Sequence, residues 1–364
     1  MSETVLKQEE RIAFALRSLY LRYGYLPYKM SKFEAYDLYV ENKDFLIGDG
    51  IITFNDTDGK LLALKPDVTL SILKNAGNDG AKQKVYYNEN VYRISGETKQ
   101  FKEIMQTGIE CIGQISLYDI YETLYLAVAS LQKISEEYVL DISHLGILSA
   151  ILEDLGAGET FNRKLMRLIA EKNVHETQAL CLRYGISEEN TKKVCTIIRA
   201  YGSIPAVIQT LTPLCRSEKA KGALDELTAL YALFQDTPYA DKLRLDFSVV
   251  NDMQYYNGIV FKGFVGGVCE GVLSGGQYDR LSARMGRNSG AIGFAVYLDL
   301  LQNIRREKTQ FDVDVIVLTD EHSCLQTVAK TVRTLVTGGE SVRVENSVGT
   351  LRAKRIVNLT GGAK

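Results

Sequence analysis

Strand-like segments lie on both sides of a long block with helical periodicity, and this order limits the folds open to the chain. From about residue 157 to residue 240, nearly every segment repeats its apolar residues at helical spacing. Short apolar or alternating segments precede this block and resume after it in LRLDFSV, GIVFKGFV and CEGVLSGG. Such a chain folds most simply as one mostly antiparallel sheet that a helical insertion interrupts. We therefore predict an α+β fold with a discontinuous main domain.

Local signals predict the elements around this sheet. Residues 3–24 carry apolar side chains at helical spacing, and this pattern ends at Gly24. A glycine at that position suits a helix that ends in a left-handed cap. The dipeptide Asp58-Gly59 predicts the turn of a hairpin, followed by a further helix. Beyond about residue 306, a strand, a helix and two more strands predict a small C-terminal α/β unit.

Charge and cysteine content argue against several classes of partner. The 364 residues include 43 Lys and Arg against 45 Asp and Glu, a net charge of −2, so we expect neither nucleic acid nor a membrane as partner. Six scattered cysteines form no CxxC pair and the three histidines lie far apart, so we expect no metal site, disulfide or cofactor. No apolar run approaches about 18 residues, and a cytoplasmic protein is the simplest expectation.

The stretch VYRISGETKQFKEIMQTGIECIG, residues 91–113, predicts a pocket. Its second strand, from Ile104 to Cys111, places Gln106, Gly108 and Glu110 on one face because strand side chains alternate. We interpret this face as a pocket floor, with open space above the glycine between an amide and a carboxylate. Such a floor suits a small cationic or N–H-rich ligand.

Five motifs occur in register along the chain: LKPDVTL, the 91–113 stretch, DMQYYNGIVF, SGGQYDRL and GAIGFAVYLDLL. Together they resemble the catalytic core of class II aminoacyl-tRNA synthetases of the histidyl type. The resemblance implies a synthetase-like domain over residues 1–306, with a helical insertion at about 157–240. It also implies that residues 307–364 form an α/β unit that is truncated relative to an anticodon-binding domain.

The resemblance further implies a histidine-binding site. Asp67, which replaces a glutamate of the family, and Thr69 are expected near the α-ammonium group, while Glu110 is expected to face the imidazole N–H. Charge-assisted hydrogen bonds of this kind contribute about 1.5 to 3 kcal/mol each. The full predicted set is Asp67, Thr69, Gln106, Glu110, Tyr256 and Tyr278.

Departures from the family pattern concern the nucleotide. The catalytic arginine of the family corresponds to Asn251, the arginine that holds the γ-phosphate corresponds to Leu300, and Tyr297 replaces a glycine. Removing one preorganised electrostatic stabiliser usually costs on the order of 100- to 1000-fold in rate. We therefore expect no catalytic residues, and we interpret Arg93 as the remnant of a nucleotide site, now a plain ion-pair partner.

A retained amino-acid pocket beside a degenerate nucleotide site is similar to the regulatory subunits of ATP phosphoribosyltransferase. That resemblance implies a short-form catalytic subunit as partner in the first step of histidine biosynthesis, histidine as feedback effector, and a homodimer within a larger hetero-oligomer. Two alternatives remain open: an active histidyl-tRNA synthetase, and a synthetase-like ligase with another acceptor. Both would need the missing arginines.

Overall fold

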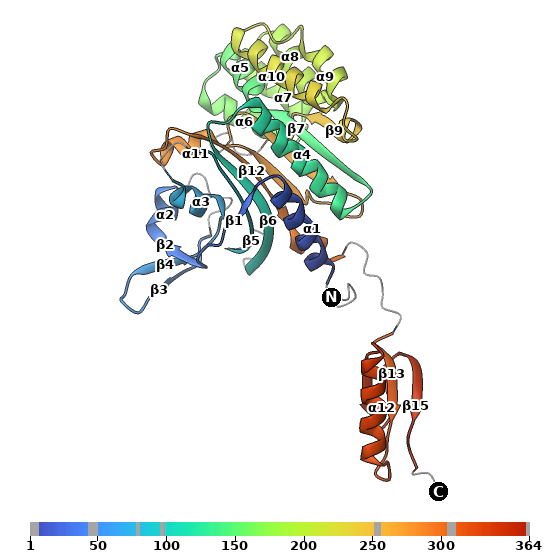
Figure 1. The fold of residues 1–364 in the computed structure, drawn as a ribbon. Helices are drawn as coiled ribbons and strands as arrows, with labels where there is room; N and C mark the ends of the chain where they lie inside the picture. Colours follow the sequence, from blue (N-terminus) through green and yellow to red (C-terminus); the bar gives the residue numbers. More distant parts are fainter. Residues whose placement is uncertain are drawn as a thin grey trace. The chain divides into compact units, whose positions relative to one another are not determined.

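The chain divides into two compact units, Met1–Ile304 and Arg305–Lys364, which are described separately (Figure 1). The computed structural model describes residues 7–42, 50–77, 81–94, 98, 100–250, 256–303 and 311–361, with the side chains of residues 302 and 303 left out.

A nine-stranded mixed sheet forms the centre of the first unit. Its strands come from both sides of the helical block, and among the described strands the neighbours pair antiparallel except for β1 with β5 and β7 with β9. The predicted mostly antiparallel, interrupted sheet is therefore confirmed. In spatial order the strands are β1 (Leu26–Pro27), β5 (Gln83–Ile94), β6 (Phe101–Gly113), β12 (Gly290–Tyr297), β11 (Leu273–Gln277), β10 (Ile259–Val265), β7 (Tyr138–His144), β9 (Leu243–Asp246) and β8 (Tyr201–Ser203).

Two helices, α1 (Gln8–Arg22) and α4 (Leu117–Ile134), pack on one face of this sheet (Figure 1). Leu16 of α1 and Leu131 of α4 are fully buried in the same cluster as Ile109 of β6, which shows where the main core lies. The chain leaves α1 through Gly24, whose φ of 79° lies in the left-handed region that glycine adopts without strain, as predicted. The opposite face of the sheet carries the candidate functional site that is described below.

In the described part of the chain, five helices form the helical block and a sixth, α5, directly precedes it. Their outward faces carry i,i+4 ion pairs such as Arg167–Glu171. Strand β8 lies inside the block and pairs with β9, so one short segment of the predicted helical insertion belongs to the edge of the sheet. Three residues are too few for alternation to be seen, and the pairing partner lies about 40 residues away in the sequence. The helices are α5 (Leu145–Leu155), α6 (Glu159–Ala170), α7 (Val174–Arg183), α8 (Glu188–Arg199), α9 (Ile204–Leu211) and α10 (Glu218–Phe234).

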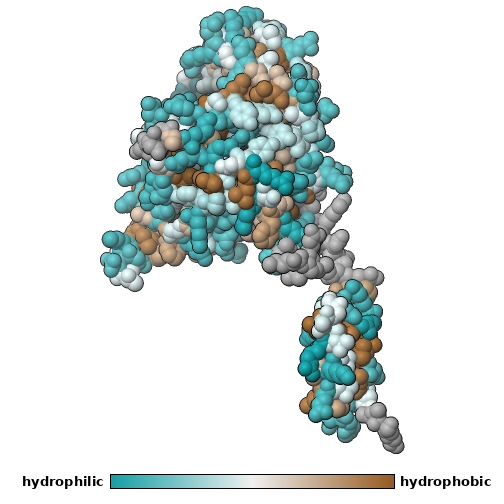
Figure 2. Space-filling model, viewed as in Figure 1, coloured by the Kyte–Doolittle hydropathy of each residue, from teal (hydrophilic) through white to brown (hydrophobic). Residues whose placement is uncertain are grey.

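A small antiparallel sheet precedes β5, in the order β2 (Phe33–Ala35), β4 (Leu61–Leu64) and β3 (Thr53–Asn55). Gly59, with φ of 79°, forms the predicted turn between β3 and β4. The chain runs from β4 through Asp67 into α3 (Thr69–Asn75), and α2 (Tyr36–Glu41) lies against the small sheet. Figure 2 shows apolar surface, in brown, near this sheet on a face that is otherwise mostly hydrophilic.

Shorter elements complete the first unit: α11 (Asp279–Arg284) and the 3₁₀ turns η3 (Ala240–Lys242) and η4 (Leu298–Asn303). The chain thus leaves β12 through the 3₁₀ turn η4. In the second unit, β13 (Val313–Leu318) pairs in parallel with β14 (Val342–Glu345) and with β15 (Ala353–Asn358), and α12 (Leu325–Thr337) connects β13 to β14. This confirms the predicted α/β unit. No described helix has the length and apolar character needed to cross a membrane.

Candidate functional site

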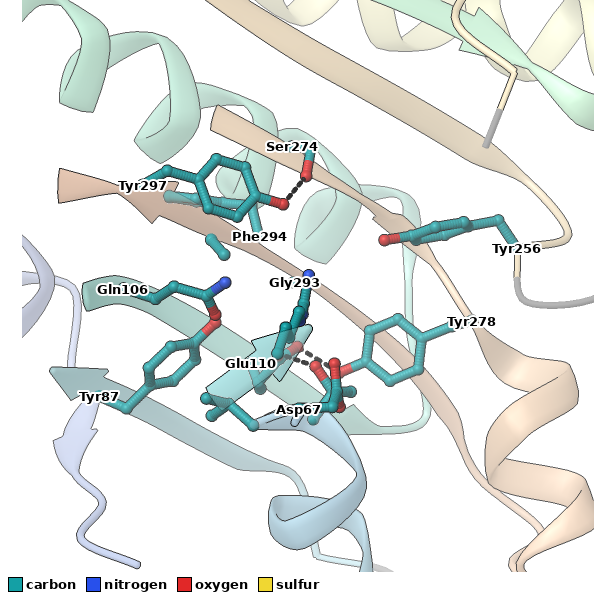
Figure 3. A pocket seen from close by; sticks show the side chains of 14 residues that line it. Asp67, Tyr87, Gln106, Glu110, Tyr256, Ser274, Tyr278, Gly293, Phe294 and Tyr297 are labelled. Carbon is teal, nitrogen blue, oxygen red and sulfur yellow. Dashed lines mark hydrogen bonds between the residues drawn. The ribbon is translucent and has the colours of Figure 1, made fainter. Parts of the chain in front are cut away.

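A pocket opens on the sheet face opposite α1 and α4 (Figure 3). All six predicted histidine-binding residues line it, together with Arg93. The space within it is about 430 Å³ when its open mouth is included. The lining consists of Asp67, Val68, Thr69, Tyr87, Arg93, Gln106, Glu110, Tyr256, Ser274, Tyr278, Gly293, Phe294, Ala295 and Tyr297.

Glu110 of β6 is held by two hydroxyl groups from distant parts of the sequence. Its Oε1 accepts a hydrogen bond from Thr69 Oγ1 at 2.8 Å, and its Oε2 accepts one from the Tyr278 hydroxyl. Thr69 begins α3 and Tyr278 directly precedes α11, so two helix starts fix the carboxyl group. Only 2% of Glu110 is exposed, and this carboxyl group is therefore both buried and oriented.

Burial raises the pKa values of the two carboxyl groups at this end of the pocket, those of Glu110 and Asp67. Loss of solvent raises the pKa of Glu110 to about 8, against the lowering effect of the Tyr278 and Thr69 hydrogen bonds, and nearby Asp67 raises it further. Burial also raises the pKa of Asp67, although Arg93 opposes this shift. The empty pocket thus keeps two buried carboxyl groups whose ionised forms a bound cation would stabilise.

Gly293 of β12 provides the space for the Glu110 carboxyl group. The two residues are partners in the β6–β12 pairing, and a Cβ added at Gly293 would lie 1.8 Å from Glu110 Oε2. It would also lie 2.4 Å from the Ile109 carbonyl oxygen, a backbone atom that cannot turn aside. Position 293 therefore requires a glycine because these two oxygen atoms lie so close to it, and not because a phosphate group has to bind there.

The space above Gly108 is filled, so the interpretation of this glycine as an open pocket floor is wrong. A Cβ at Gly108 would lie 2.1 Å from the Phe294 carbonyl oxygen and 2.7 Å from the Tyr87 hydroxyl oxygen. Tyr87 stands opposite Gly108 in the β5–β6 pairing, and its ring occupies the position that the missing side chain leaves. The wall of the pocket is the tyrosine, which sequence reasoning missed.

The aromatic side of the pocket depends on another glycine. A Cβ at Gly276 of β11 would lie 2.6 Å from Cδ1 of Tyr256, so this position lets the tyrosine ring approach the sheet. A Cβ added at Gly275 would likewise lie 2.3 Å from the carbonyl oxygen of Gly293. Gly275 and Gly276 therefore both permit a close approach within the sheet.

Arg93 lies at the end of β5 and donates a hydrogen bond from Nε to the Pro66 carbonyl oxygen at 2.8 Å. Its positive charge opposes the rise that burial causes in the pKa of Asp67, which follows Pro66 in the chain. Arg93 also lines the pocket, and its interpretation as the remnant of a nucleotide site stays a prediction.

Ser274 and Tyr297 were not predicted as pocket residues. The Tyr297 hydroxyl and Ser274 Oγ are hydrogen-bonded at 2.6 Å, and Tyr297 pairs with Gln106 across β12 and β6 (Figure 3). Alternation along β12 was the available signal, since Gly293, Ala295 and Tyr297 share the face that carries Glu110.

Of the positions that depart from the synthetase pattern, Asn251 lies outside the described residues. Leu300 lies in η4 and packs, partly buried, against the main core. Within the described residues, no three His, Cys, Asp or Glu side chains are grouped as a metal site would need.

Comparison with known proteins agrees with this geometry. A family model described as histidyl-tRNA synthetase matches residues 1–301. The ATP phosphoribosyltransferase regulatory subunit of Oceanobacillus iheyensis is 28% identical over 290 residues, 79% of this chain and 71% of the relative.

Solved structures show the same fold. A Bacillus halodurans protein, described as an ATP phosphoribosyltransferase regulatory subunit/histidyl-tRNA synthetase, matches with a TM-score of 0.77 at 24% identity, over 98% of this chain and 95% of its own. A chain of the ATP phosphoribosyl transferase (HisG:HisZ) complex from Thermotoga maritima matches with a TM-score of 0.64 at 21% identity, over 80% and 97%. The predicted class II synthetase-like fold and the likeness to these regulatory subunits are confirmed, and the chain belongs to the histidyl-tRNA synthetase family.

Proposed function

We propose that this chain is a non-catalytic regulatory and activating subunit of an ATP phosphoribosyltransferase, and that it binds histidine as the feedback effector of histidine biosynthesis. Curated relatives along most of its length carry the name of that subunit. The Thermotoga maritima structure that shares its fold is a two-component ATP phosphoribosyl transferase complex. A short-form catalytic subunit is the partner that this proposal requires.

The carboxyl group of Glu110 carries the histidine assignment. It is buried, held by Thr69 and Tyr278, and close enough to Asp67 for the two charges to interact. Histidine offers two groups that such a pair accepts, an α-ammonium ion and an imidazole N–H. Gln106 adds an amide at the other end of the pocket, so that a ligand with both cationic and polar groups has partners along its length.

The assignment of a regulatory rather than catalytic role follows from what stands beside this pocket. Leu300 replaces the arginine that would hold a γ-phosphate, and it packs against the core. Tyr297 extends over the sheet toward Ser274, in the region where the family keeps a glycine. An active synthetase or ligase would need a cation at these positions to stabilise charge on phosphate.

Histidine controls the partner, in this proposal, through linkage. Binding to the pocket favours one arrangement of the complex over another, and the difference in affinity sets the limit of inhibition. A coupling free energy of about 1 to 3 kcal/mol gives roughly 5- to 150-fold control.

We also propose a homodimer that forms through α1 and β1, within the larger hetero-oligomer. Phe14 and Leu21 lie seven residues apart, on one stripe of α1, and are 51% and 47% exposed. Leu26 of β1 is 65% exposed. Apolar side chains presented outward at this spacing are typical of a buried helix contact between subunits.

The test of the proposed function begins with histidine binding. Glu110→Ala should weaken L-histidine binding by about 2 kcal/mol, because it removes a charge-assisted partner, and isothermal titration calorimetry measures this directly. Glu103→Gln is the matched control, since Glu103 is an exposed carboxylate on the same strand. Equal affinity in the wild-type protein and in Glu110→Ala would remove Glu110 from the site.

Reconstitution tests the regulatory role. The catalytic phosphoribosyltransferase chain should gain turnover when this chain is added, and L-histidine should inhibit the mixture with wild-type protein but much less with Glu110→Ala. Histidine-dependent exchange of pyrophosphate into ATP by this chain alone would instead establish a synthetase.

A further inference from the structure

We propose that Tyr297, held in place by Ser274, restricts the pocket to a free amino acid and excludes any ligand that continues from the amino-acid carboxylate into a nucleotide. This inference rests on the proposed histidine site and adds the residue that defines the ligand's maximum length. It concerns selectivity between free histidine and an acyl-nucleotide, which share the same histidine part.

Small residues line the pocket on β12 as far as Tyr297. Gly293, Ala295 and Tyr297 follow one another on the pocket face of β12, opposite Glu110, Gly108 and Gln106 of β6. Tyr297 lies four positions after Gly293, which corresponds to about 13 Å along a strand. Gly293 accommodates the Glu110 carboxyl group, and Tyr297 is the first large side chain on this face of the strand.

The tyrosine ring is fixed rather than free to turn away. Its hydroxyl is hydrogen-bonded to Ser274 Oγ at 2.6 Å, and Ser274 pairs with Ala295 in the β11–β12 ladder. The side chain therefore extends from the end of β12 toward Ser274 of β11 (Figure 3). Leu298, the next residue, is fully buried and anchors the backbone behind it.

The two ends of the pocket differ in chemistry, which orients the ligand. Glu110, Asp67 and Tyr278 lie together at one end, whereas Gln106, Tyr87 and Tyr297 lie at the other (Figure 3). Cationic groups of histidine belong with the carboxyl groups at the first end. A nucleotide that extends from the amino acid toward the neutral end would meet the ring of Tyr297.

A gain-of-binding experiment tests this. Dissociation constants for L-histidine and for 5′-O-[N-(L-histidyl)sulfamoyl]adenosine, a non-hydrolysable acyl-nucleotide analogue, are measured by calorimetry for the wild-type protein and for Tyr297→Gly, Tyr297→Phe and Ser274→Ala. The measured quantity is the ratio of the analogue's constant to that of histidine. We expect the wild-type ratio to fall at least tenfold in Tyr297→Gly and at least threefold in Ser274→Ala, where the ring loses its anchor.

Tyr297→Phe keeps the ring but, like Ser274→Ala, loses the hydrogen bond between the two residues, so it should lower the ratio to a similar extent. Glu103→Gln, at an exposed position of β6, is the control that should keep the wild-type ratio. Thermal melting shows whether each variant folds, and Ser274→Ala carries the test if Tyr297→Gly does not. An unchanged ratio in folded Tyr297→Gly, or wild-type protein that binds the analogue as tightly as histidine, would overturn the assignment of Tyr297. Failure of wild-type protein to bind histidine at all would contradict the proposed function itself.

Discussion

Single residues determine the chemistry of the pocket, and the environment of Glu110 strongly changes the pKa of this residue. Burial raises its pKa to about 8, so in the empty pocket the carboxyl group is protonated over most of the physiological range. A cationic or N–H ligand binds the ionised form, and must therefore displace a proton below pH 8. The hydroxyl groups of Thr69 and Tyr278 limit this cost because they donate to the ionised carboxylate.

Histidine affinity should accordingly rise with pH between 6.5 and 8 and level off above pH 8. The slope is at most about tenfold per pH unit, because one proton is released on binding. Calorimetry at several pH values, with Glu110→Gln for comparison, separates this effect from titration of the ligand's own imidazole. Parallel pH profiles for the two proteins would show that Glu110 stays ionised in the empty pocket.

Sequence reasoning predicted the identity of these residues better than their surroundings. All six proposed histidine-binding residues meet in one pocket, but they were chosen through resemblance to a family rather than from alternation alone. Alternation by itself misread Gly108, because the ring that fills its space comes from Tyr87 on the neighbouring strand. Contacts between strands are set by register, which a single segment does not encode.

At the scale of elements, long periodic segments were predictable and short ones were not. Helices such as α1 and α4, and the hairpin turn at Gly59, follow their local signals. Strand β8 and the 3₁₀ turn η4 depend on packing against the sheet and the core, so their local sequence is a weak guide. Strand β12 carries the strictest local requirement, since Gly293 faces both a side chain and a backbone oxygen.

Gly293→Ala should therefore destabilise the protein and abolish histidine binding, because its Cβ would overlap Glu110 Oε2. Gly222→Ala is the matched control, since Gly222 lies exposed in α10 with nothing within 4 Å of an added Cβ. That control should stabilise the protein by about 0.5 to 1 kcal/mol. Urea unfolding followed by circular dichroism measures both effects, and equal stability of the two variants would contradict the packing argument.

For the whole molecule, the pocket lies entirely in the first unit, and the proposed dimer contact lies on elements of the same unit. The outward stripe of α1 is the feature that a subunit contact would cover. Its apolar residues could be counted from the sequence, but their exposure could not, because helical spacing alone does not say which face meets the sheet.

Leu21→Glu should shift the protein from dimer to monomer at micromolar concentration, because a carboxylate would be buried without a partner in the contact. Leu182→Glu serves as the control, because Leu182 is 82% exposed on α7 in the helical block. Sedimentation velocity distinguishes the species. A monomeric wild-type protein would count against the proposed interface.

The parallel pairing of β7 with β9 has a consequence for how the chain acquires its structure. Ile142 pairs with Leu245, and closing a flexible loop of about 100 residues costs roughly 4 kcal/mol of chain entropy. Helix α5, which directly follows β7, packs against α10, which ends shortly before β9. Once these two helices are in contact, the ends of β7 and β9 are already neighbours. We therefore expect the helical block to form early in refolding and β9 to pair with β7 afterwards.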